Sequence, residues 1–175
     1  ALDSRGGVYF TDPVFARAYQ DTTAFYYLAA DRSIKRLADD LKYPNGILLS
    51  PDEKTLYVLP YLSPNVMAYE VKSPGVLGEG RSLCELACKA EYPKRGGDGL
   101  TVDTKGNLYV TVPSIKSIQV IDSDGKTLGM IPLPNGPSNC TFAGADRKTL
   151  YVTTAKVVYA LPMQAQGHQS GKLAK

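Results

Sequence analysis

Three short polar residues stand at one position of a repeated motif and could bind a hard metal cation. Asn45 and Asp98 are each followed by glycine, and Asn139 is followed by cysteine. Carboxylate and amide oxygens are the donors that Ca²⁺ and Mg²⁺ prefer. Asn and Asp beside glycine also favour turns at the starts of strands, so the metal-site and the turn interpretation both stay open.

These residues belong to a repeat whose period is marked by tyrosines. Tyr9, Tyr57, Tyr109 and Tyr151 follow one another at intervals of 48, 52 and 42 residues. Each unit has a short apolar strand, a tight turn of Asp, Gly, Ser or Pro, and a strand around the tyrosine, which predicts a β-hairpin. Further strands are expected at residues 24–28, 33–37, 66–71, 82–86, 117–121, 126–133 and 157–161.

About four strands per repeat of ~45 residues, without helical periodicity, predict an all-β fold of β-propeller blades. The 175 residues amount to about four blades, of which the first lacks its innermost strand and the last its fourth. We therefore expect a partial propeller over residues 1–163, followed by a flexible C-terminal tail at residues 164–175. Either a preceding segment of a longer chain or another chain is expected to complete the ring.

The propeller arrangement predicts where the polar residues meet. The innermost strand of each blade lines the central channel, so the first residues of these strands converge at one mouth. Antiparallel pairing brings residues 11–13, 59–61 and 112–114 to the same mouth. The loop at residues 14–23 is a candidate flap or an ordinary surface loop, and Lys94 and Arg95 precede Asp98 closely enough to reach the mouth.

Composition and motifs exclude several classes of function. The net charge of +3 is small and dispersed, which gives no indication of a nucleic-acid partner. No apolar run approaches the roughly 20 residues of a membrane span, and no signal peptide is visible. Phosphate-binding loops and the Gly-x-Ser-x-Gly elbow are absent.

Other reactive residue types are expected to be structural. Asp52, Asp103 and Asp146 fall in hairpin turns, which Asp stabilises. The single histidine, His168, lies in the tail and is a poor candidate for a catalytic base. The three cysteines, Cys84, Cys88 and Cys140, are too few for a disulfide scaffold, and with one histidine they lack the ligands of a zinc site. Buried free thiols are expected.

The motifs resemble those of the gluconolactonase/regucalcin (senescence marker protein 30-like) family over nearly the whole chain. The segments concerned are Pro44-Asn45-Gly46, Ser50-Pro51-Asp52, Gly97-Asp98-Gly99-Leu100, Gly106-Asn107-Leu108-Tyr109 and Pro137-Ser138-Asn139-Cys140. The resemblance implies a six-bladed propeller with one divalent metal in its channel. It implies Ca²⁺ first, with Zn²⁺, Mg²⁺ or Mn²⁺ as alternatives.

The resemblance also implies roles for single residues. Asn45 and Asp98 match two metal ligands of the family, and Asp98 would act in catalysis as a ligand or as a base. Asp12, Tyr61 and Asn139 are candidate substrate contacts. A glutamate and a further asparagine of the family's ligand set have no counterpart in this sequence, and both are expected in a preceding segment.

The implied reaction is hydrolysis of a sugar lactone or related ester, whose small-molecule substrate is the expected partner, without a nucleic acid or a membrane. Two other hypotheses stay open. One is a non-catalytic propeller that serves as a binding module. The other is a hydrolase of the same fold that acts on organophosphates, aryl esters or strictosidine-like substrates. The compartment also stays open between the cytoplasm and a periplasmic or secreted location.

Overall fold

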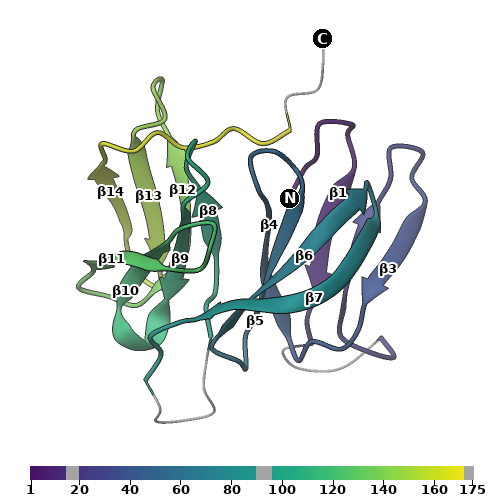
Figure 1. The fold of residues 1–175 in the computed structure, drawn as a ribbon. Coiled ribbons are helices and arrows are strands. Elements are labelled where there is room, and N and C mark those ends of the chain that lie inside the picture. The colour runs from purple at the N-terminus through teal and green to yellow at the C-terminus, as the bar shows by residue number, and fades with distance from the viewer. Residues whose placement is uncertain (15–19, 90–95, 172–175) are drawn as a thin grey trace.

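Fourteen strands in the described residues form four antiparallel sheets, which stand side by side as the blades of a partial ring (Figure 1). The structure is a computed structural model that describes residues 1–14, 20–89 and 96–171. Two sheets have four strands and two have three. This arrangement confirms the predicted all-β propeller with about four blades.

The strands run outward from the channel in chain order within each blade. Blade 1 contains β1 (Val8–Asp12), β2 (Ala24–Leu28) and β3 (Ile34–Ala38). Blade 2 contains β4 (Pro44–Leu49), β5 (Thr55–Pro60), β6 (Asn65–Ser73) and β7 (Val76–Glu85). Blade 3 contains β8 (Leu100–Val102), β9 (Leu108–Val112), β10 (Ser117–Ile121) and β11 (Thr127–Pro132). Blade 4 contains β12 (Pro137–Ala143), β13 (Thr149–Thr154) and β14 (Val158–Pro162).

Three inner strands, β4, β8 and β12, lie next to one another along the channel. Blade 1 has only the end of such a strand, since Leu2 forms an isolated bridge with Val8. The only helical element in the described ranges is the short 3-10 turn η1 (Pro113–Ile115). Accordingly, the described part of the chain contains no helix long and apolar enough to span a bilayer.

The turn aspartates have the structural role that the sequence predicts. Asp103 accepts hydrogen bonds from the backbone amides of Lys105 and Asn107, and its side chain is buried. Asp52 likewise accepts from the hydroxyl of Ser50 and the amide of Lys54. These bonds close the hairpins at the end of each blade that lies away from the predicted mouth.

The repeat tyrosines bury themselves against the next blade. Tyr9 packs with strands of blade 2, Tyr57 with blade 3 and Tyr109 with blade 4. Their exposed fractions are 1%, 4% and 5%, whereas Tyr151, in the last blade, is 39% exposed. Blades 1 to 3 therefore each bury one face against the following blade, and no described strand covers the corresponding face of blade 4.

Residues 164–171 form a segment that we call the C-terminal strap. The amide of His168 donates to the carbonyl of Val102, and the amide of Gly167 donates to that of Arg147. Gly171 lies against the side chain of Leu2 in blade 1. The strap thus crosses from blade 4 over blade 3 toward blade 1 at the turn end of the channel (Figure 1). These contacts belong to residues after position 163, where the sequence predicts a flexible tail.

Candidate metal and catalytic site

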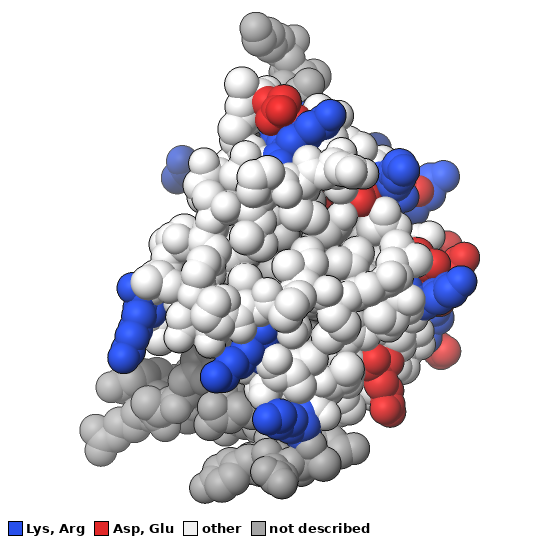
Figure 2. All heavy atoms as spheres, turned by 90° about the vertical axis from the view of Figure 1, so that its left-hand side faces the viewer, with Lys and Arg blue, Asp and Glu red and all other residues white. Residues whose placement is uncertain are grey.

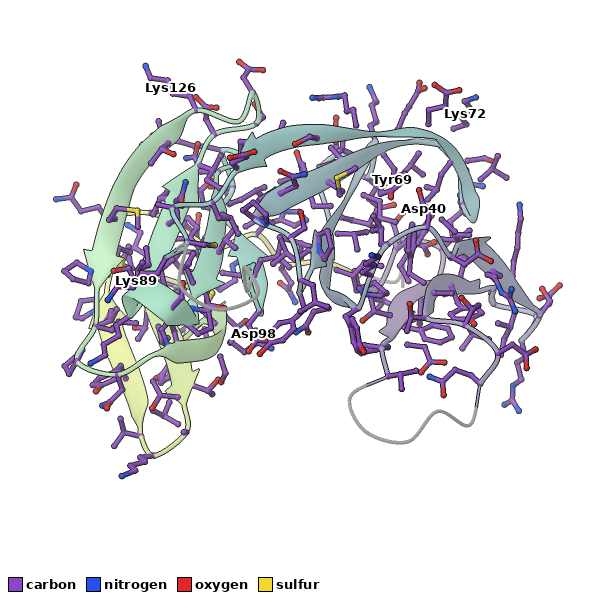
Figure 3. The ribbon with its side chains drawn as sticks, turned by 90° about the horizontal axis from the view of Figure 1, so that it is seen from below. Asp40, Tyr69, Lys72, Lys89, Asp98 and Lys126 are labelled. Carbon is purple, nitrogen blue, oxygen red and sulfur yellow. The ribbon has the colours of Figure 1, made fainter. Side chains whose placement is uncertain are left out.

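Asn45 and Asp98 meet at the mouth of the channel, as their equivalent repeat positions predict. Nδ2 of Asn45 donates a hydrogen bond of 2.9 Å to Oδ1 of Asp98. Asn45 is the second residue of β4, and Asp98 comes two residues before β8. Figure 3 looks into this end of the molecule and shows Asp98 near its centre, between blades 1 and 2 on one side and blades 3 and 4 on the other.

A bulge in blade 2 positions Asn45. The register of β4 with β5 shifts between Pro44 and Ile47, so Asn45 and Gly46 stand outside the regular ladder. Bulges of this kind redirect a side chain and are common beside functional sites. The hydroxyl of Thr11 in β1 donates a 2.8 Å hydrogen bond to the carbonyl oxygen of Asn45 and so ties this bulge to blade 1.

The glycine after each polar residue makes room for the next blade. A Cβ on Gly46 would lie 2.5 Å from the backbone oxygen of Asp98, and one on Gly99 would lie 2.3 Å from Oδ1 of Asn139. Neither glycine has a positive φ, so no turn conformation requires them. Close approach between blades therefore explains why glycine follows Asn45 and Asp98.

The carboxyl group of Asp98 is half-buried and has one hydrogen-bond donor in the described structure. Burial raises the pKa of Asp98 because it removes water from the charged form. The hydrogen bond from Asn45 opposes this shift in pKa without cancelling it. A cation close to the second carboxylate oxygen would stabilise the charged form of Asp98.

Asn45 and Asp98 carry the type of donor atom that a hard cation prefers, but they supply only part of its coordination shell. Asp98 offers a carboxylate oxygen, and rotation of the Asn45 amide would offer a carbonyl oxygen. Ca²⁺ takes six to eight oxygens. The described residues contain no group of three or more His, Cys, Asp and Glu side chains that could hold a metal ion. The remaining ligands must therefore come from elsewhere, including water.

Asn139 and Asp12, two of the candidate substrate contacts, flank this pair. The side chain of Asn139 lies against Gly99, which places it beside Asp98, and it is exposed. Asp12 follows Thr11 at the end of β1, and its Oδ1 accepts a hydrogen bond from Gln20.

The third candidate, Tyr61, follows β5 at the same end of the blades. Its amide donates to the carbonyl of Tyr43, and its carbonyl accepts from Gly96. These bonds place its backbone between the strand that leads to Asn45 and the segment that leads to Asp98. All three residues stay predictions as substrate contacts.

Several sequence predictions fall elsewhere. Half of the predicted flap, residues 15–19, lies outside the described residues, as do Lys94 and Arg95. His168 lies in the strap at the opposite end of the channel, where it lines a cavity of about 710 Å³ with Leu48, Leu100 and Phe142 from the inner strands. All three cysteines are free, as predicted, and Cys140 is buried.

Two threonines lie beside the candidate ligands: sequence analysis placed Thr11 at this mouth without a role, and it missed Thr111. Thr11 and Thr111 both stand two residues after a repeat tyrosine. The hydroxyl of Thr11 contacts the backbone of Asn45, and that of Thr111 contacts the backbone of Gly99. Their shared repeat position is the sequence signal that could have identified them.

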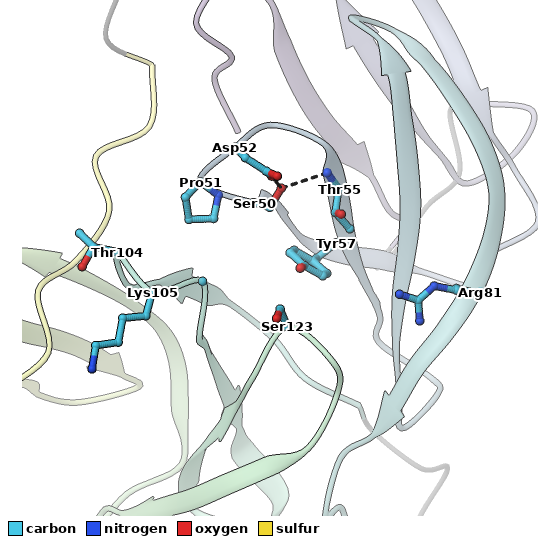
Figure 4. A pocket seen from close by; sticks show the side chains of 10 residues that line it. Ser50, Pro51, Asp52, Thr55, Tyr57, Arg81, Thr104, Lys105 and Ser123 are labelled. Atoms are coloured by element: carbon cyan, nitrogen blue, oxygen red, sulfur yellow. Dashed lines mark hydrogen bonds between the residues drawn. The ribbon is translucent and has the colours of Figure 1, made fainter.

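A second cleft lies between blades 2 and 3 at the turn end, away from Asn45 and Asp98 (Figure 4). It has a volume of about 310 Å³ and is lined by Ser50, Asp52, Thr55, Tyr57, Arg81 and Lys105, among others. Asp52 is engaged there in the turn contacts described above. None of the candidate ligands or substrate contacts lines this cleft, so it plays no part in the candidate site.

Comparisons with known proteins identify the family of this chain. The sequence model of a family described as "SMP-30/Gluconolactonase/LRE-like region" matches residues 1–156. The chain is 34% identical to a gluconolactonase of Zymomonas mobilis over 166 residues, which are 86% of this chain and 45% of that protein. It is 30% identical to regucalcin of Gallus gallus over 135 residues, which are 75% of this chain and 44% of that protein.

A solved structure extends the comparison to three dimensions. The gluconolactonase XC5397 from Xanthomonas campestris superposes with a TM-score of 0.80 at 32% identity, and the match covers 92% of this chain and 55% of that one. The chain therefore spans about half the length of the relatives it matches.

Proposed function

Because the chain belongs to the SMP-30/Gluconolactonase/LRE-like family, we propose that the whole protein hydrolyses a sugar lactone or a related ester at the channel mouth. The observation that carries the proposal is the pairing of Asn45 and Asp98 at 2.9 Å. It brings two oxygen-bearing side chains from different blades together at the channel mouth.

Asn45 and Asp98 would hold a divalent cation. Both donors are hard oxygens, which suit Ca²⁺, Mg²⁺ and Mn²⁺ better than Zn²⁺, and the family resemblance puts Ca²⁺ first. Bound there, such an ion supplies Lewis acidity toward a carbonyl oxygen and lowers the pKa of a coordinated water. Asp98 is the residue of this chain that can accept a proton at the site. Its second oxygen, Oδ2, accepts no hydrogen bond from the described residues, which leaves it open to a ligand or a water.

The substrate would be oriented by the polar residues around the pair. Asn139 on one side and Asp12 on the other offer hydrogen-bonding groups at the same mouth. Hydroxyl-rich sugar lactones need several such partners in fixed positions. The small molecule would thus be held by blades 1 to 4 while the ester carbonyl faces Asp98.

Two further blades would complete the ring and the ligand set. The outward face of blade 4 exposes Tyr151, Val157 and Val158, and Figure 2 shows charged side chains mainly at the margins of this side of the molecule. Phe10 and Tyr26 stack on each other in blade 1 and are half-buried. A segment outside this sequence, or a second chain, would cover both faces and bring the missing ligands to the mouth.

The test uses the whole protein that contains this chain, with gluconolactone as substrate and acid release as the readout. We expect EDTA to abolish hydrolysis and CaCl₂ to restore it. Asp98→Asn should lower turnover by at least ~100-fold, as expected for loss of an acid–base or ligand group, while the circular dichroism spectrum stays unchanged. Asp124→Asn, an exposed turn residue at the other end of blade 3, is the matched control and should keep full activity.

Two outcomes would contradict the proposal. Calcium binding without turnover of any lactone would indicate a binding module. Turnover of aryl esters or phosphotriesters, with lactones inert, would indicate a different hydrolase on the same fold.

A further inference from the structure

The backbone around Asp98 is held by one buried hydroxyl group. Thr111 in β9 is fully buried, with an exposed fraction of 0%. Its Oγ1 accepts a hydrogen bond of 2.8 Å from the amide of Gly99 and lies 2.9 Å from the carbonyl oxygen of the same residue. The amide and the carbonyl group of Gly99, the residue after Asp98, therefore both contact the hydroxyl of Thr111.

The same hydroxyl also reaches the next blade. Oγ1 of Thr111 lies 3.2 Å from the carbonyl oxygen of Ser138, which itself accepts from the amide of Gly99. The amide of Asp98 donates to the carbonyl of Thr111. The peptide that carries Asp98 is thus fixed between β9 and β12, and Asn139 follows directly after the anchoring Ser138.

A threonine in blade 1 does the same for Asn45. Thr11 has the repeat position of Thr111, and its hydroxyl donates to the carbonyl oxygen of Asn45 at 2.8 Å. The two candidate ligands, which differ in residue type and in blade, therefore share one kind of support. In both cases a side-chain hydroxyl holds the main chain, and no described bond of these hydroxyls reaches the ligand side chain itself.

The fold does not require threonine at this repeat position. Blade 2 has Leu59 there, which is also fully buried, and its methyl group packs beside Gly46 and Gly97. An apolar side chain of similar or larger size therefore suits the same place in a blade. The threonines at this position, Thr11, Thr111 and Thr153 of blade 4, differ from Leu59 in that each hydroxyl contacts a backbone carbonyl oxygen.

Resting on the proposed function, we propose that Thr111, with Thr11 as its counterpart, is a positioning residue that holds Asp98 in the orientation that binds the cation. A ligand oxygen has to be held within about half an ångström for a site to work. Side chains that orient ligands typically change metal affinity 10–100-fold when they are lost. Thr111 orients Asp98 through the main chain.

The test compares Thr111→Val and Thr111→Ser in the whole protein, with CaCl₂ alone as the titrant in calorimetry. Valine keeps the shape and removes the hydroxyl, whereas serine keeps the hydroxyl. The amide of Gly99 retains its bond to Ser138 in both variants, so both are expected to fold. We expect Thr111→Val to weaken calcium binding at least ~10-fold and Thr111→Ser to stay within about twofold of the parent.

A metal-free readout separates this inference from the proposed function. Amide hydrogen exchange at Asp98 and Gly99, measured in EDTA, should be faster in Thr111→Val by ~10-fold or more and near the parent rate in Thr111→Ser. Thr11→Val should weaken calcium binding while leaving exchange at Gly99 unchanged. Thr149→Val, at the opposite end of β13 and without a described side-chain hydrogen bond, is the matched control for both readouts.

Each outcome tests either the proposed metal site or the positioning role of Thr111. A parent protein that binds no divalent ion contradicts the proposed metal site, and faster exchange in Thr111→Val would still support the positioning role. Unchanged exchange and unchanged calcium affinity in Thr111→Val overturn the inference. So does a Thr111→Ser variant as impaired as Thr111→Val, because the hydroxyl would then not be the group that matters.

Discussion

Nδ2 of Asn45 donates a 2.9 Å hydrogen bond to Oδ1 of Asp98 across 53 positions of sequence. The two residues meet because each stands at the start of the innermost strand of its blade, and the inner strands of blades 2 and 3 are neighbours. The bond gives the half-buried carboxylate one donor and joins the two blades at the channel mouth.

Asn45→Asp should make the stability of the contact between residues 45 and 98 depend on a bound metal ion. Two carboxylates would face each other and the donor would be lost, which we expect to cost about 2 kcal/mol of the free energy of unfolding in EDTA. Saturating CaCl₂ should recover most of this loss, because a cation favours both charges. Thermal unfolding with and without calcium measures the difference. Equal destabilisation in both conditions would contradict a shared cation site.

Gly46→Ala should destabilise the protein and disturb the site together. The added Cβ would meet the backbone oxygen of Asp98 at 2.5 Å, and overpacking of this kind costs about 1–3 kcal/mol. Gly129→Ala in β11 is the control, since its Cβ would meet no atom within 4 Å, and we expect it to stay within about 0.5 kcal/mol of the parent. Urea unfolding of both variants gives the comparison.

Tyr151→Ala tests whether a further blade covers blade 4. In the whole protein, we expect the variant to lose about 3 kcal/mol of the free energy of unfolding, like Tyr109→Ala, because both rings would be buried against a following blade. In the 175-residue chain alone, where Tyr151 is 39% exposed, the loss should be much smaller than that of Tyr109→Ala. An equally small loss in the whole protein would argue against ring closure at this face.

The strap should loosen as the pH falls. Burial lowers the pKa of His168, Arg147 lowers it further, and Glu53 opposes both. The unfolded state binds a proton near the ordinary histidine pKa of about 6.5, whereas the folded state stays neutral to a lower pH, so stability falls as the pH drops below about 6.5. Limited proteolysis of residues 164–171 should therefore be faster at pH 5.5 than at pH 7.5. His168→Gln should remove this difference.

Cys140 should be inert toward alkylation in the folded protein. Burial raises the pKa of Cys140 to about 12, so its thiolate is scarce at pH 8, and the thiolate is the reactive form. Iodoacetamide at pH 8 should modify Cys140 only after denaturation, whereas the half-buried Cys88 should react first. Mass spectrometry of the tryptic peptides identifies the modified residue, and early labelling at Cys140 would contradict the described packing.

Much of the fold was predictable because the repeat sets both the strands and their order. The strands at residues 24–28 and 117–121 have the predicted bounds. β6 and β7 extend beyond the predicted ranges 66–71 and 82–86 and meet at a tight turn in which Gly75 has a φ of 72°. Many of their additional residues are charged or glycine, so the sequence pattern typical of a strand is weak there. Main-chain hydrogen bonds pair these residues in the sheet.

The sequence predicted that the two principal residues of the candidate site, Asn45 and Asp98, lie together. Equivalent repeat positions placed Asn45 and Asp98 at one mouth, since the geometry of a propeller follows from its period. Thr111 was not predicted because its hydroxyl acts on main-chain groups, and its only signal in the sequence is the repeat position that it shares with Thr11. The strap was missed for the same reason, since the amide of His168 binds the carbonyl of Val102 whatever the side chains are.

The strap also bears on the kinetics of the proposed lactonase. It lies across the channel end that faces away from Asn45 and Asp98, so a substrate that reaches Asp98 would enter at the mouth. Lactone and hydroxy acid would then pass through the same opening in opposite directions. The acid should compete with the lactone for that opening, and progress curves should slow earlier than substrate depletion accounts for.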